Sequence, residues 1–162
     1  MEFTGDELAG VVDLFGGLTH DELSEALAEL AYRQGEGYDA SAFEDPIDEA
    51  IKAYYLVAVD PDALGAAVTE PLLLAGPLAF PTLPTDARDL PHILDVETRT
   101  VSTEVVGPAV VEMFREDAMA AIEADDTERI DTLLDASYEL EPWAGVTVEG
   151  IREELAGATQ TN

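Results

Sequence analysis

The stretch PLLLAGPLAFPTLP, residues 71–84, contains no charged residue, although the 162-residue chain carries a formal net charge of −29. Its four prolines are Pro71, Pro77, Pro81 and Pro84. Proline is compatible with the start or the edge of a strand but not with its middle. The stretch therefore predicts a strand that begins at Pro71 and ends at Gly76-Pro77, followed by extended chain.

A second strand is predicted just upstream, where YLVAV at 55–59 combines aromatic and β-branched residues. The two strands would pair across a loop with the sequence DPDALGAAVTE. Burial of the stretch explains the missing charges, because an unpaired charge in the core is costly. In this interpretation the extended chain after the second strand packs Leu78, Phe80 and Leu83 against the helices. The alternative is an apolar strip that a partner covers. The candidate interaction surface is then Leu72, Leu74, Leu78, Phe80 and Leu83.

Helical patterns precede the hairpin. Thr4 with Glu7 and Thr19 with Glu22 form two capping boxes, each followed by an apolar stripe at helical spacing. The second of these helices is expected to end near Gly35. Asp45 followed by Pro46 suggests the start of a third helix, which leads into the first strand.

Helical patterns also follow the hairpin. Between Val96 and Val106 a strand or the beginning of a helix is expected, and a helix begins near Pro108. Asp125 with Glu128 predicts the cap of the next helix, and a last helix follows Thr147 and ends at Gly157. The predicted fold is mainly α with a small β-hairpin (α+β). Its units are a winged-helix-like N-terminal half with the Pro-rich segment (1–95), a helical C-terminal lobe (96–157) and a frayed tail (158–162).

Composition limits the class of protein. Asp and Glu number 36 against 7 Lys and Arg, yet 47% of the residues are hydrophobic, which predicts a folded chain. The absence of Cys excludes disulfides, thiolate nucleophiles and cysteine-bound metals. The N-terminus MEFTGDELAG lacks the basic region of a signal peptide, and no apolar run approaches the roughly 20 residues of a membrane helix. A cytoplasmic location is expected.

Scattered acids with a single lysine, Lys52, resemble the proteins of extremely halophilic archaea, in which molar salt screens the repulsion. The segments LFGGLTHDELSEALAELAYRQGE and FPTLPTDARDLPHILDV resemble the short uncharacterised acidic proteins of haloarchaeal genomes. That resemblance implies that the protein comes from a haloarchaeon, and it identifies no functional residues.

The order of three helices and a strand pair over residues 4–80, with LTHDELSEAL at the second helix, resembles a winged helix. The resemblance implies that the reading helix lies at about 43–55. Its exposed positions include Glu44, Asp45, Asp48 and Glu49 against Lys52, so it would repel DNA phosphates. A winged-helix-like module that contacts protein is therefore expected in preference to one that binds DNA directly.

Sites of chemistry are not indicated. The loop from Asp60 begins like a calcium loop but has Leu64 and Pro71 where oxygen ligands belong. Asp89, His92, Asp95 and Glu97 form a possible metal cluster, for which ordinary surface is the favoured interpretation. His20 and His92 lie in no nucleophile pattern, and no phosphate loop is present. The residues Tyr54, Tyr55, Phe80 and Trp143 are interpreted as packing rather than a ligand pocket.

The sequence thus predicts no catalytic residue, cofactor or metal. The leading hypothesis is a non-catalytic interaction or regulatory module with an unknown protein partner. The alternative is a winged-helix transcription regulator, favoured if Arg33, Arg88 and Arg99 share one face. The third hypothesis is an enzyme without a recognisable motif.

Overall fold

A computed structural model describes residues 3–37, 39–60, 70–84, 87–94, 96, 98–99, 101–145 and 147–160. The chain divides into two compact units, Met1–Val101 and Ser102–Asn162. It is mainly α-helical with a small two-stranded antiparallel sheet among these residues, as the sequence predicts.

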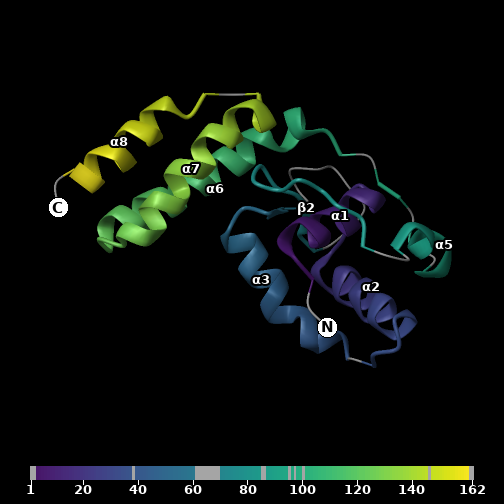
Figure 1. The fold of residues 1–162 in the computed structure, drawn as a ribbon. Coiled ribbons are helices and arrows are strands. Elements are labelled where there is room, and N and C mark those ends of the chain that lie inside the picture. The colour runs from purple at the N-terminus through teal and green to yellow at the C-terminus, as the bar shows by residue number, and fades with distance from the viewer. Residues whose placement is uncertain are drawn as a thin grey trace. The chain divides into compact units, whose positions relative to one another are not determined.

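The first unit begins with two capped helices. Helix α1 (Gly5–Phe15) and helix α2 (His20–Arg33) both start with the predicted capping boxes, in which Thr4 and Thr19 accept hydrogen bonds from the Glu7 and Glu22 N–H groups. Helix α1 packs against α2, α3 and both strands (Figure 1). The apolar stripes of α1 and α2 are fully buried, and each leucine in them contributes about 2 kcal/mol.

The third helix begins one residue earlier than Asp45, the predicted cap. A 3₁₀ turn η1 (Ala40–Phe43) runs directly into α3 (Glu44–Lys52), so Phe43 is the N-cap residue and Pro46 lies at the third helical position. Proline is compatible with this position because the first N–H groups of a helix have no intrahelical partner.

The predicted hairpin is present. Strand β1 (Leu56–Val59) pairs antiparallel with β2 (Leu72–Ala75), and Leu56 lies opposite Ala75. Leu18, in the connection between α1 and α2, forms an isolated bridge to Leu73, with N–H to O distances of 3.2 and 2.6 Å in the two directions. This bridge joins the hairpin to the α1–α2 connection. The turn itself, 61–69, lies outside the described residues, and so does most of the rejected calcium loop.

Two short helical turns follow the hairpin, η2 (Ala87–Asp89) and α5 (Leu90–Leu94). Residues 96–101, expected in the second unit, belong to the first. The reason is Arg99, whose N–H donates to the Phe15 carbonyl at 2.6 Å and whose side chain reaches Gly17 and Glu22. The described residues between Val96 and Ser102 form no strand.

The second unit consists, in its described residues, of α6 (Thr103–Glu123), α7 (Thr127–Ala144) and α8 (Glu149–Gln160), which pack against one another. Gly107 on α6 faces Ala144 on α7, and a Cβ at Gly107 would lie 2.8 Å from the Ala144 carbonyl oxygen. Ser102 is the N-cap residue of α6, which places Pro108 inside this helix rather than at its start. The core is made by residues such as Phe114, Leu133, Leu140 and Leu155.

The ends of α7 and α8 differ from the expected ones. Asp126, not Asp125, caps α7, because its side chain accepts the hydrogen bond from the Arg129 N–H at 3.1 Å. Helix α8 continues to Gln160, so the tail predicted to fray from residue 158 is helical there. Gly157 costs a helix only about 1 kcal/mol relative to alanine, too little to end it without a left-handed cap.

Arg152 joins α8 to α7. Its guanidinium donates to the Ser137 hydroxyl at 3.0 Å and to the Glu141 carboxylate at 2.7 Å, and it lies 4.2 Å from the centre of the Tyr138 ring. Glu141 also accepts a hydrogen bond from the Val148 N–H just before α8. These contacts fix the α7–α8 connection.

Candidate functional site

The predicted interaction surface divides into a buried and an exposed part. Leu72 is 0% exposed and Leu74 is 6% exposed, and both lie on strand β2, which is paired with β1. These two side chains belong to the core. The other three residues, Leu78, Phe80 and Leu83, follow the strand and have a different environment.

The chain leaves β2 through a tight contact with the end of α3. The Gly76 N–H donates to the Tyr55 carbonyl at 2.8 Å, and the Leu78 N–H donates to the Tyr54 carbonyl at 3.1 Å. A Cβ at Gly76 would overlap the Tyr54 carbonyl oxygen, so this approach requires glycine. Leu78 is half-buried.

Residues 78–83, which we call the strap, then cross α1. The Asp6 carboxylate accepts a hydrogen bond from the Phe80 N–H at 2.9 Å, and the Asp6 carbonyl accepts one from the Thr82 N–H at 3.0 Å. The Thr82 hydroxyl donates to the Phe80 carbonyl at 3.0 Å. One residue of α1 therefore holds the backbone of the strap at two points.

Gly10 permits the strap to lie directly on α1. This glycine is buried within the helix, and a Cβ on it would overlap the backbone of Thr82. The strap and α1 are thus in backbone contact, which explains a glycine on the apolar face of a helix where alanine would favour helix formation by about 1 kcal/mol.

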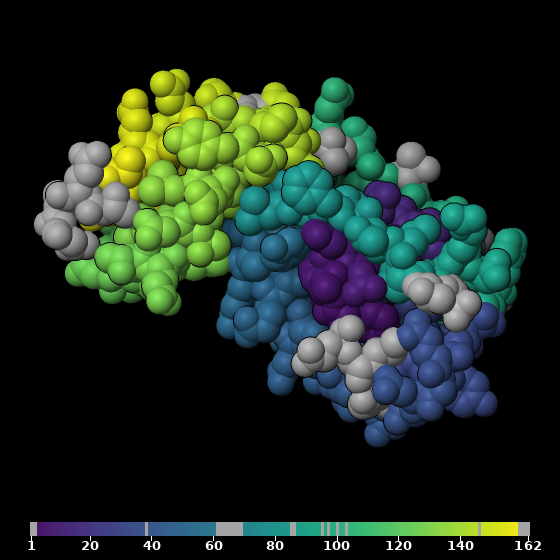
Figure 2. Space-filling model, viewed as in Figure 1, coloured from purple at the N-terminus to yellow at the C-terminus, as the bar shows by residue number. Residues whose placement is uncertain are grey.

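The side chains of the strap point mostly outward. Phe80 is 77% exposed and Leu83 is 42% exposed, so the prediction that both pack against the helices is wrong. The physical reason is that backbone groups of the strap, not its side chains, face α1. In Figure 2 the teal residues of the strap region lie at the surface beside the purple residues of α1. The strap therefore presents side chains that carry no charge, among them the exposed Phe80 and Leu83.

An ion pair fixes the end of the first unit. The Arg99 guanidinium donates to both carboxylate oxygens of Glu22, at 2.8 and 3.2 Å, and to the Gly17 carbonyl at 2.9 Å. Burial alone would raise the pKa of Glu22, but the hydrogen bonds from Arg99 and the Thr19 N–H, with the charge of Arg99, outweigh it and lower the pKa. Gly16, with φ +82°, allows the backbone of Arg99 to approach.

Of the three arginines proposed for DNA contact, two form ion pairs within the first unit and the third is exposed. Arg99 is held by Glu22 and Gly17, and Arg33 pairs with Glu29 at 3.4 Å on the same helix. Arg88 is exposed on η2. On α3 the exposed residues are Glu44, Asp45, Pro46, Asp48, Glu49 and Lys52. This helix presents four carboxylates and one ammonium, which is unfavourable for contact with phosphates.

Neither of the two histidines lies in a cluster of candidate metal ligands among the described residues. His20 Nε2 lies 3.2 Å from the Asp48 carboxylate and so joins the start of α2 to α3. His92 is exposed on α5, and its proposed neighbours Asp95 and Glu97 lie outside the described residues. In the part of the chain that the structure describes, no three His, Asp or Glu side chains are grouped as metal ligands.

The aromatic residues considered as a ligand pocket differ in their exposure. Tyr54 is buried, Tyr55 and Trp143 are half-buried, and Phe80 is exposed. Tyr55 lies against Gly5 of α1, where a Cβ would be only 2.6 Å from the tyrosine ring. Within the described residues, no helix combines the length and the apolar character that crossing a membrane requires.

Comparison with known proteins gives a family and no activity. The chain matches no curated protein and no solved structure. A family model matches residues 6–160, which include the strap, Asp6 and Gly10. The chain therefore belongs to the family described as "Family of unknown function (DUF7109)".

Proposed function

We propose that this protein is a non-catalytic protein-interaction or regulatory module, and that the strap is the surface that contacts its partner. The observation that carries the proposal is the position of Phe80: it is 77% exposed although its backbone is hydrogen-bonded to Asp6. Aromatic side chains are enriched among the residues that contribute most to protein interfaces.

The strap is suited to binding because its backbone is already ordered. Association loses free energy when loops and side chains become fixed, and a surface that is fixed beforehand loses less. Two hydrogen bonds from Asp6 and the close contact at Gly10 hold the strap in the free protein. Phe80 and Leu83 are therefore presented on a fixed support.

The charge pattern supports the same surface. A chain with a net charge of −29 repels other acidic proteins, but residues 71–84 carry no charge. The side chains of the strap therefore bring no ionised group of their own to a partner. The strap is thus a part of the chain where apolar contact is least opposed.

We further propose that the protein works in the potassium-rich cytosol of a halophilic archaeon. The 36 acidic residues are distributed along the chain, and molar salt reduces the Debye length to about 3 Å. Helix content and stability, measured by circular dichroism, should then rise with potassium chloride toward molar levels. Complete folding in dilute buffer would contradict this proposal.

A second candidate, a winged-helix-like regulator, is favoured by the chain order of the first unit. Helices α1, α2 and α3 precede the β1–β2 hairpin, and the Leu18–Leu73 bridge attaches this hairpin to the α1–α2 connection. The acidic exposed face of α3 supports contact with protein rather than with DNA. DNA binding would require a dimer or arginines supplied from elsewhere on the surface.

Affinity purification in molar potassium chloride, with and without nuclease, separates the two candidates. The interaction module predicts a protein that is recovered in stoichiometric amount and survives nuclease treatment. Recovery of nuclease-sensitive DNA alone would contradict it and support the regulator.

A further inference from the structure

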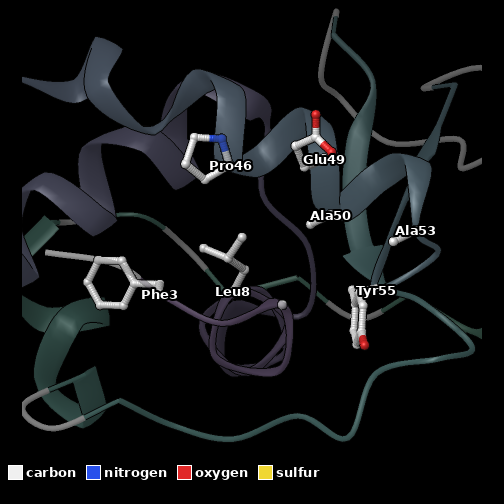
Figure 3. A pocket seen from close by; sticks show the side chains of 8 residues that line it. Phe3, Leu8, Pro46, Glu49, Ala50, Ala53 and Tyr55 are labelled. Atoms are coloured by element: carbon white, nitrogen blue, oxygen red, sulfur yellow. The ribbon is translucent and has the colours of Figure 1, made fainter.

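The recess between the N-terminal segment and α3 has a floor of buried side chains. Figure 3 shows Phe3 and Tyr55 at its two ends with Leu8 between them, and both Leu8 and Ala50 are buried. Among the described residues that line it, Glu49 has the one charged side chain, so no set of polar groups converges on a ligand there. The strap, in contrast, presents a defined pattern of hydrogen-bonding groups.

The backbone of the strap has used its donors within the protein. The residues whose N–H donates to another backbone group or to Asp6 are Leu78, Ala79, Phe80 and Thr82. Pro81 has no N–H group. A carbonyl oxygen has two lone pairs, so it can still accept a hydrogen bond from outside. Across residues 78–82 the backbone of the strap therefore offers a partner acceptors and no free donor.

This pattern is incompatible with a partner that adds a strand to the strap. Pairing between strands requires both donors and acceptors at alternate residues. One alternate set, 78, 80 and 82, directs its donors to the first unit, and in the other set Ala79 does the same and Pro81 has none. A second copy of this chain presents the same acceptors, so two straps cannot pair with each other. The donors must come from side chains of the partner.

The exposed side chains at the centre of the strap are apolar. Phe80 is 77% exposed and is followed by the exposed Pro81, whereas Pro84 is buried and belongs to the support. Proline favours an extended conformation for itself and for the residue before it. Extended segments that contain proline are recognised by grooves lined with aromatic side chains. Tyrosine and tryptophan combine an apolar ring with an O–H or N–H donor, and these are the two properties that the strap requires.

We propose that the partner binds the strap in a groove lined by tyrosine and tryptophan side chains. Their rings cover Phe80 and Pro81, and their O–H and N–H groups donate to carbonyls of the strap. Molar salt screens charges, but this mode of binding uses apolar contacts and neutral hydrogen bonds and does not depend on an ion pair. The inference rests on the proposed function, because it names the kind of surface that contacts the strap.

The first test is nuclear magnetic resonance of the full chain labelled with ¹³C-proline. The probe, added in molar potassium chloride, is the protein that co-purifies with the wild type. Aromatic rings stacked on Pro81 should shift its ring-proton resonances upfield. Pro108, exposed on α6, is the control and should not shift. Unchanged Pro81 resonances in the bound chain would overturn the aromatic groove.

The second test is the Pro81→Ala variant, which removes the ring and restores an N–H group. Its affinity for the same protein, measured by calorimetry, should fall about fivefold to tenfold, because a covered ring and part of the preorganisation of the strap are lost. Pro108→Ala should bind as the wild type does. A partner that adds a strand would bind Pro81→Ala at least as tightly as the wild type, since the new N–H supplies a donor, and this result would overturn the proposal.

The inference and the proposed function fail in different ways. If no protein is recovered, or if Phe80→Ser still retains it, both are contradicted. If Phe80→Ser loses the protein but Pro81→Ala binds it as the wild type does, the strap remains the interaction surface and only the aromatic groove is overturned.

Discussion

The carboxylate of Asp6, in the first turn of α1, accepts a hydrogen bond from the backbone N–H of Phe80 at 2.9 Å, across 74 positions of sequence. The bond fixes an extended segment whose aromatic side chain remains exposed. It explains how an uncharged stretch of an acidic protein can be ordered without being buried. The same contact makes Asp6 the first residue to change.

Asp6→Ala should free the Phe80 N–H and lower the free energy of unfolding by about 1–2 kcal/mol, since a hydrogen bond to a charged group and a favourable helix-terminus charge are both lost. Hydrogen exchange at the Phe80 amide should become correspondingly faster. Asp13→Ala, at an exposed position of the same helix, is the control. Unchanged exchange at Phe80 would contradict the described attachment of the strap.

Gly10→Ala should destabilise the first unit although alanine favours helix. The added Cβ overlaps the Thr82 backbone, so the strap must move away from α1, and a loss of about 1–3 kcal/mol is expected. Gly37→Ala, where nothing lies within 4 Å of the added atom, should be nearly neutral. Urea unfolding followed by circular dichroism measures both. A Gly10→Ala protein as stable as the wild type would argue against backbone contact between the strap and α1.

Leu74→Asp and Phe80→Asp should have opposite outcomes. Leu74 is 6% exposed and lies opposite Val57 in the hairpin, so a carboxylate there is buried without a partner and should prevent folding of the first unit. Phe80→Asp should fold with a wild-type circular dichroism spectrum. Loss of folding in Phe80→Asp would show that the Phe80 side chain is buried in the core, contrary to this account.

The Glu22–Arg99 pair should give the first unit a specific dependence on pH. Because the folded-state pKa of Glu22 is lowered, its stabilisation is present above the unfolded pKa of about 4.3 and is lost as the pH falls through the folded value. Arg99→Gln should therefore lower stability at neutral pH by about 2 kcal/mol and flatten the decline in acid.

Arg33→Gln is the control for this prediction, because Arg33 pairs with Glu29 only as exposed neighbours along α2. Its free energy of unfolding should follow the wild-type dependence on pH. An Arg99→Gln variant with the same acid decline as the wild type would show that the pair does not lower the pKa of Glu22.

Local chemistry made the helices and the hairpin predictable. The capping boxes at Thr4 and Thr19 predict the helices that follow them, and the segments YLVAV and PLLLA predict two strands. Two N-caps differ from the predicted ones by one or two residues. The cap of α3 is Phe43 rather than Asp45, because a 3₁₀ turn precedes the helix, and the cap of α7 is Asp126 rather than the neighbouring Asp125, which has the same side chain. Such boundaries depend on which side chain reaches the first free N–H groups.

The candidate site was only half predictable. The missing charges in 71–84 marked Leu72 and Leu74 as core, but the exposure of Phe80 depends on Asp6, a residue 74 positions away. Asp6 has the ordinary signature of an acid in the first turn of a helix. Gly10 carried the available signal, because a glycine on the apolar face of a helix indicates close approach by another backbone. Its partner, Thr82, could come only from the fold.

The measurement that tests the central claim most directly is the recovery of the co-purified protein by three forms of this chain in molar potassium chloride: wild type, Phe80→Ser and Tyr32→Ser. Tyr32 is 73% exposed on α2, so its replacement removes a comparably exposed aromatic ring away from the strap. The account predicts that Phe80→Ser loses the partner, with at least about a tenfold reduction in recovery, while Tyr32→Ser retains it. Equal recovery by all three forms would contradict the assignment of the strap as the interaction surface.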